Sequence, residues 1–150
     1  MFDAIARFFS TASSDRLDND DPRLAVAVLL VHLAAVDGTV GDEEKLAVRR
    51  ALQEHYGMAE EDVRALVREA RRRDAEAVDF YHFTSALAQL EEQQRIAIVR
   101  MMWQVVFADK KNHELEDNMV WRIAELIGVS ARQRTILRNQ MARGEAGPAA

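Results

Sequence analysis

The sequence predicts an all-α fold, a compact bundle of about seven to eight helices. Helix-favouring residues such as Ala, Leu, Glu and Arg dominate the 150 residues, which include only 2 prolines and 6 glycines. Apolar residues recur at helical spacing along most of the chain. Two segments are apolar around nearly the whole circumference of a helix, which is typical of helices that are covered on several sides.

The composition excludes several classes of protein. With 49% hydrophobic and 30% charged residues, the chain resembles a globular domain and not a disordered segment. The absence of cysteine excludes disulfides, thiolate metal sites and cysteine nucleophiles. A net charge of −5 disfavours nucleic-acid binding, because affinity for nucleic acids comes mostly from a cationic surface. We therefore expect one folded domain with no nucleic-acid partner.

Residues 1–21 are expected to form an amphipathic segment and a polar linker. Over residues 2–10 the apolar side chains fall on one helical stripe, which consists of Phe2, Ile5, Phe8 and Phe9. The stripe either packs on the domain or contacts a protein partner or, peripherally, a membrane surface. This start has no basic region before an apolar run, and no segment reaches the ~20 apolar residues of a transmembrane helix. We expect a soluble cytoplasmic protein of unknown oligomeric state.

The first apolar segment predicts a central helix from Leu24 to Val36. Asp21 precedes Pro22, an arrangement in which the aspartate caps the free N–H groups and proline occupies the first turn. His32 interrupts the apolar run, and we interpret it as a hydrogen-bonded core histidine and not as a metal ligand. Amphipathic stretches predict three further helices, over residues 42–55 with Gly57 as C-cap, 60–73 and 79–89.

The second apolar segment predicts another central helix, from Ile96 to Ala108. Arg100 and Gln104, four residues apart, mark its one exposed strip, and its Trp103 is expected in the core. A helix that begins at Asn112 or His113 and ends at Ile127 follows. The last predicted helix is capped by Ser130 and runs to about residue 143, after termination of the previous helix at Gly128.

The two halves of the chain are related by an internal repeat. A shift of 72 residues aligns the apolar helices, the turns that follow them and Glu44 with Glu116, and a shift of 71 aligns Gly57 with Gly128. Neither half can bury its apolar helix alone. We therefore expect the halves to pack around a pseudo-twofold axis with both apolar helices at the centre.

An acidic turn follows each apolar helix, at residues 37–44 and 109–117. A carboxylate is unfavourable beside the exposed carbonyls of a helix end, so Asp37 and Asp109 need backbone N–H groups, an arginine or a cation as partners. The first turn does not fit an EF-hand loop, because position 12 counted from Asp37 is Val48. The second does not fit the H-E-x-x-H zinc motif, because Asp117 replaces the second histidine.

Both turns carry a family resemblance. The segment Ala35-Val36-Asp37-Gly38, with Val40, Glu43 and Glu44, resembles the leading Asp-Gly motif of the bacterial TerB-like domains associated with tellurite resistance. Ala108-Asp109 with His113-Glu114-Leu115-Glu116 resembles their second acidic motif. One departure is Lys110, which occupies the place of the second-half glycine and makes any site there less open. The resemblance spans roughly residues 22–142, so we assign 22–143 to the domain and 144–150 to a flexible tail.

The resemblance implies a binding module in a stress response to tellurite, other oxyanions or metals. Carried over by position, it implies a metal site whose ligands are Asp37, Glu44, Asp109, His113 and Glu116. Oxygen-rich ligands suit Ca²⁺, Mg²⁺ or Mn²⁺, and the one imidazole leaves Zn²⁺ open. The alternative is a purely structural protein–protein interaction domain without metal, in which the acidic residues only cap turns and helix starts.

Catalysis is not expected. No serine or lysine nucleophile has a visible base beside it, and no glycine-rich phosphate loop is present. The basic run of Arg68 with residues 71–73 is interpreted as a solvated face near a helix end, with an acidic partner as the alternative. We therefore expect a non-enzymatic module with one or more protein partners.

Overall fold

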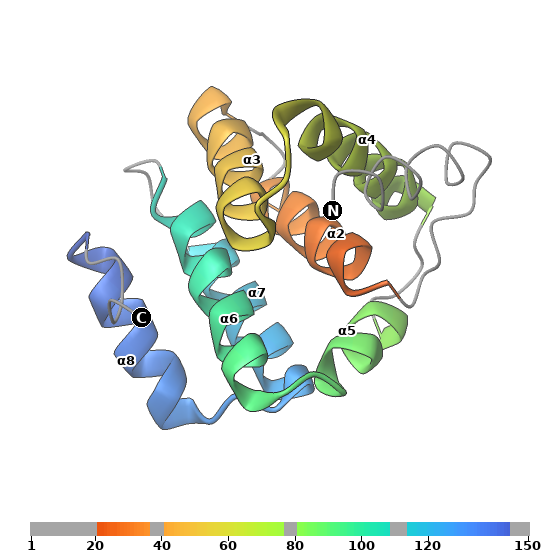
Figure 1. Cartoon of the computed structure of the whole chain (residues 1–150). Helices are drawn as coiled ribbons and strands as arrows, with labels where there is room; N and C mark the ends of the chain where they lie inside the picture. Colours follow the sequence, from red (N-terminus) through yellow and green to blue (C-terminus); the bar gives the residue numbers. More distant parts are fainter. Residues whose placement is uncertain (1–20, 37–40, 77–80, 109–113, 145–150) are drawn as a thin grey trace.

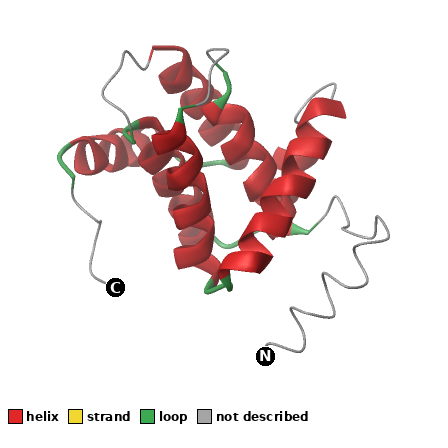
Figure 2. Ribbon diagram, turned by 90° about the horizontal axis from the view of Figure 1, so that it is seen from above, coloured by secondary structure: helices red, strands yellow, loops and turns green. Residues whose placement is uncertain are grey.

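The computed structural model describes residues 21–36, 41–76, 81–108 and 114–144. Within these ranges the chain forms α helices joined by short loops and contains no strand, which confirms the predicted all-α fold (Figures 1 and 2). The predicted N-terminal segment and most of the tail lie outside the described residues. The helices are α2 (Pro22–Ala34), α3 (Asp42–Tyr56), α4 (Glu60–Glu76), α5 (Tyr81–Ala88), α6 (Glu92–Val106), α7 (Glu114–Ile127) and α8 (Ala131–Ala142).

The two apolar helices, α2 and α6, pack against each other in the middle of the bundle (Figure 1). Every residue of α2 from Leu24 to Leu30 is fully buried. On α6 the buried face includes Met101, Met102 and Trp103, whereas Arg100 and Gln104 are only half-buried. The predicted central position of both helices, and the core assignment of the tryptophan, are confirmed.

Helix boundaries follow the repeat. α2 and α6 end 72 residues apart, at Ala34 and Val106, and α3 and α7 begin 72 residues apart. α4 and α8 begin 71 residues apart. The packing repeats as well. In the first half α4 packs on α2, and in the second half α8 packs on α6. Across the halves, α3 packs on α6 and α7 packs on α2. α5 connects the halves and packs on α2 and α7.

The predicted capping residues act as expected. The Asp21 side chain accepts a hydrogen bond from the backbone N–H of Arg23 at 2.8 Å, with Pro22 in the first turn. Ser130 accepts in the same way from the N–H of Gln133 at 3.2 Å. Gly57 and Gly128 end α3 and α7 with φ angles of 63° and 82°, a left-handed conformation that favours glycine.

Some helix ends differ from the predicted ones. α6 begins at Glu92 and not at Ile96, with a polar first turn in which the Gln94 side chain accepts from the Glu91 N–H at 3.4 Å. α4 continues three residues beyond Arg73, to Glu76. The apolar pattern marks only the buried part of a helix, so exposed polar turns were missed. None of the described helices is long and apolar enough to cross a membrane.

Candidate functional site

Two of the five predicted metal ligands lie in the described part of the chain. Glu44 and Glu116 occupy equivalent places in the first turns of α3 and α7, and they are only 3% and 2% exposed. The Glu44 Oε1 accepts a hydrogen bond from the backbone N–H of Gly41 at 3.2 Å, so it closes the start of α3 as a capping residue. A carboxylate at this depth must be compensated, because burial disfavours its charge.

The other three predicted ligands, Asp37, Asp109 and His113, lie outside the described residues. Within the described residues, no group of three or more histidine, aspartate and glutamate side chains is placed to hold a metal ion. The structure thus locates one predicted ligand in each half, and the complete ligand sets stay predictions.

In the second half, a packed cluster fills the space between α6, α7 and α8. The Trp103 and Phe107 rings stack with their centroids 5.9 Å apart. The guanidinium of Arg138 lies over both rings, 5.5 and 5.4 Å from their centroids, and donates to Asp117 Oδ2 at 2.7 and 3.2 Å. The roles of the arginine and its aspartate partner were not predicted, since nothing in the helical spacing marks that contact.

In the first half, the matching space is a pocket of about 390 Å³ between α2, α3 and α4. Most of its wall is apolar, and charged side chains stand at Lys45, Arg71 and Asp74. This pocket was also not predicted. The sequence does carry a signal for it, because the repeat aligns smaller residues at the end of α2 with large aromatic residues at the end of α6. The remaining lining residues are Val31, Ala34, Ala35, Val48, Val67 and Ala75.

His32 lies at the edge of the core and is held by α4. Its Nδ1 is 3.0 Å from Asp74 Oδ1, and both side chains are half-buried. The histidine is therefore hydrogen-bonded, as predicted, although it is less deeply buried than a core residue.

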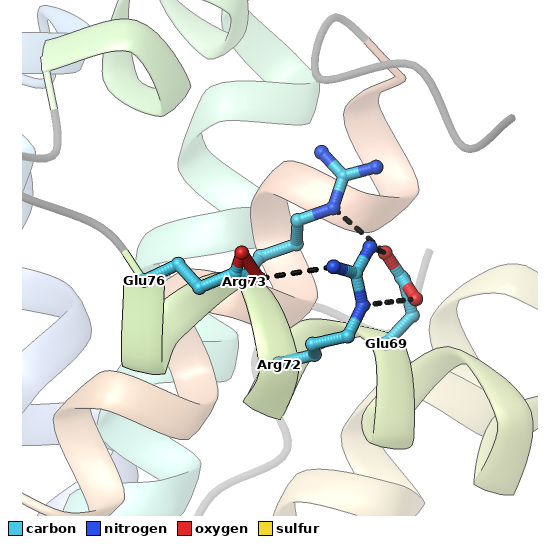
Figure 3. A network of polar contacts seen from close by, with 4 residues as sticks. All are labelled: Glu69, Arg72, Arg73 and Glu76. Carbon is cyan, nitrogen blue, oxygen red and sulfur yellow. Dashed lines mark hydrogen bonds and ion pairs between the residues drawn. The ribbon is translucent and has the colours of Figure 1, made fainter. Parts of the chain in front are cut away.

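Two arginines of the basic run on α4, Arg72 and Arg73, are paired within their own helix (Figure 3). Glu69 accepts hydrogen bonds from Arg72, with its Nε at 3.2 Å, and from Arg73 Nε at 2.7 Å, while Arg72 Nη1 also donates to Glu76 at 2.9 Å. Burial of Glu69 opposes its ionisation, but the hydrogen bonds and charges of the two arginines outweigh this effect and lower the pKa of the carboxyl. The exposed Arg72 fits the predicted solvated face, whereas Arg73 is half-buried and Arg71 lines the pocket.

The family model of the tellurite resistance protein TerB matches residues 23–139. The chain belongs to the TerB family. This confirms the resemblance that the two acidic motifs carry, and an all-α fold is the one expected for a TerB domain. No curated protein and no solved structure matches the chain.

Proposed function

We propose that this TerB-family chain is a non-catalytic binding module of a bacterial stress response to tellurite, other oxyanions or metals, and that its acidic turns chelate a divalent cation. The observation that carries the proposal is the burial of Glu44 and Glu116 at equivalent positions. Each lies at the start of the helix that follows a predicted acidic turn. A cation bound at either turn would have the buried carboxylate of that half as one of its oxygen ligands.

A second function is supported by the capping hydrogen bond between Glu44 and the Gly41 N–H. In that alternative the acidic residues only stabilise helix starts, and the chain is a structural protein–protein interaction domain without metal. The two functions differ in one measurable property, namely whether the folded state binds a cation in preference to the unfolded state.

Thermal unfolding of chelator-treated protein tests this difference. We expect Ca²⁺, Mg²⁺, Mn²⁺ or Zn²⁺ to raise Tm in a concentration-dependent way. At a cation concentration one hundred times the Kd, the free energy of unfolding should rise by about 2.7 kcal/mol. The double variant Asp37→Asn with Asp109→Asn should lose the rise. The matched control is Asp42→Asn, since Asp42 is an exposed acid of the first turn of α3 and not a predicted ligand.

The outcome separates the two functions. A Tm that none of the four cations changes would favour the structural domain and end the metal proposal. A rise that survives in the double variant would show that a cation binds elsewhere. The stress role has its own test, because deletion of the gene should lower the tellurite concentration that the host tolerates, and the wild-type chain should restore it.

A further inference from the structure

The pocket of the first half and the cluster of the second half are the same place in the repeat. Each of the four residues of the cluster aligns with a residue that lines the pocket. The helices that carry these residues begin or end at equivalent residues, so each aligned pair occupies the same place in its half. The aligned pairs are Trp103 with Val31, Phe107 with Ala35, Asp117 with Lys45, and Arg138 with Val67.

The difference in side-chain size explains why the pocket is open. Two aromatic rings and a guanidinium in the second half are replaced by a methyl group and two isopropyl groups in the first half. The resulting volume of about 390 Å³ lies within the range of small-molecule sites. The second half indicates which groups fit this space, because there the flat apolar rings of Trp103 and Phe107 occupy it.

The pocket of the first half is more positively charged than the cluster of the second half. In the second half the Asp117 carboxylate neutralises Arg138. In the first half Lys45 stands where that acid would be, and α4 adds Arg71 to the rim. Neither Lys45 nor Arg71 forms an ion pair with another described residue.

The acids near the rim are already engaged. Asp74, which also lines the pocket, is 3.0 Å from the His32 ring nitrogen. Glu69 and Glu76 pair with Arg72 and Arg73, which directly follow Arg71 in sequence (Figure 3). The described rim thus carries two cationic side chains and one carboxylate that is hydrogen-bonded to His32, so positive charge is in excess beside an apolar wall. This combination favours an anionic group attached to an apolar body.

We propose that this pocket binds a small organic anion with a flat apolar body, such as an aromatic carboxylate or sulfonate. The ring system occupies the space that Trp103 and Phe107 fill in the other half, and the anionic group lies at Lys45 and Arg71. Neither Glu44 nor Glu116 lines the pocket, and the test below uses no metal, so its failure and that of the metal proposal are distinguishable.

Fluorescence titration of the full chain with two probes tests the proposal. Anilinonaphthalene sulfonate is a flat apolar anion, and N-phenylnaphthylamine is an uncharged relative of similar shape. We expect saturable binding of the anion at one site. The double variant Lys45→Gln with Arg71→Gln should weaken its binding by roughly tenfold, as expected for the loss of two charge-assisted contacts, and change that of the neutral probe less than about twofold.

Two variants provide the controls. Arg68→Gln with Arg132→Gln removes two exposed cations outside the pocket, and it should leave the affinity for both probes unchanged. Ala35→Phe introduces the ring that the second half carries at this position, and it should abolish binding of both probes in a protein that still unfolds cooperatively.

The proposal is overturned if the wild-type chain does not bind the anion, if folded Ala35→Phe binds it as the wild type does, or if the charge variant weakens both probes equally. Should Ala35→Phe not fold, amide NMR of the wild-type chain decides the question. Shifts induced by the sulfonate must then centre on the ends of α2 and α4 and the start of α3, and shifts centred on α7 or α8 contradict the site.

Discussion

The two halves of the molecule share a backbone plan and differ in what lies beside their central helices. Beside α6, the space is filled by stacked Trp103 and Phe107 under the Arg138 guanidinium. Beside α2, the same space is a pocket walled by valines and alanines. The repeat thus preserves one boundary or both of each repeated helix, while this space is filled by side chains in one half and left open in the other. We therefore expect stability to concentrate in the second half and binding at this place in the first.

A second difference lies in the length of the third helices. α4 runs to Glu76, whereas α8 ends at Ala142 and is followed by Gly144 with a φ of 78°. The repeat aligns this glycine with Arg73, in the middle of the last turns of α4. The added turns supply Asp74 and Ala75 to the pocket wall and carry most of the ion-pair network. The open half is therefore also the half with the longer polar helix end.

The largest effect that tests this comparison is expected from Trp103→Ala. The indole is fully buried and stacked on Phe107, so its removal should lower the free energy of unfolding by about 3–5 kcal/mol. The aligned variant Val31→Ala removes two methyl groups from a half-buried side chain and should cost roughly 1 kcal/mol. Denaturant unfolding measures both, and equal costs would show that the halves do not differ in packing as described.

The fold could be predicted from sequence because it depends on periodic features. The apolar runs, the capping residues Asp21 and Ser130, and the two helix-ending glycines are local signals, and each acts as expected. The start of α6 was placed four residues late because exposed turns carry no apolar signal.

The candidate sites were harder to predict because they depend on contacts between helices. Asp117 and Arg138 are 21 residues apart in sequence, and no spacing rule brings them together. The pocket is a space that small side chains leave, so it appears only when aligned residues are compared by size. Burial of Glu44 and Glu116 likewise requires the packed helices, although the repeat had already marked these two positions as equivalent.

A smaller effect should distinguish the two glycines that end α3 and α7. The Cβ of an alanine at Gly57 would meet no atom within 4 Å. Gly57→Ala should therefore lower the free energy of unfolding only by the strain of the left-handed backbone, roughly 1 kcal/mol. Alanine at Gly128 would place its Cβ 2.9 Å from Arg95 Nη1, which donates to the Ile127 and Gly128 carbonyls. We expect Gly128→Ala to lower the free energy of unfolding by about 2 kcal/mol, measured by denaturant unfolding. A cost no larger than that of Gly57→Ala would mean that Arg95 moves aside freely.

The smallest effect concerns the ion pairs of the longer helix end. Because the pKa of Glu69 is lowered in the folded chain, its ionised form stabilises the fold at pH values above the ordinary 4.5, and this contribution is lost as the pH falls below it. Glu69→Gln should lower Tm by about 2 °C at pH 7, and the difference from wild type should shrink progressively as the pH falls below 4.5. Glu60→Gln, which breaks the exposed pair with Arg64, is the matched control and should change Tm less. A Glu69→Gln deficit that persists unchanged at low pH would assign its effect to helix packing, and the charged network of α4 would then contribute nothing to the difference between the halves.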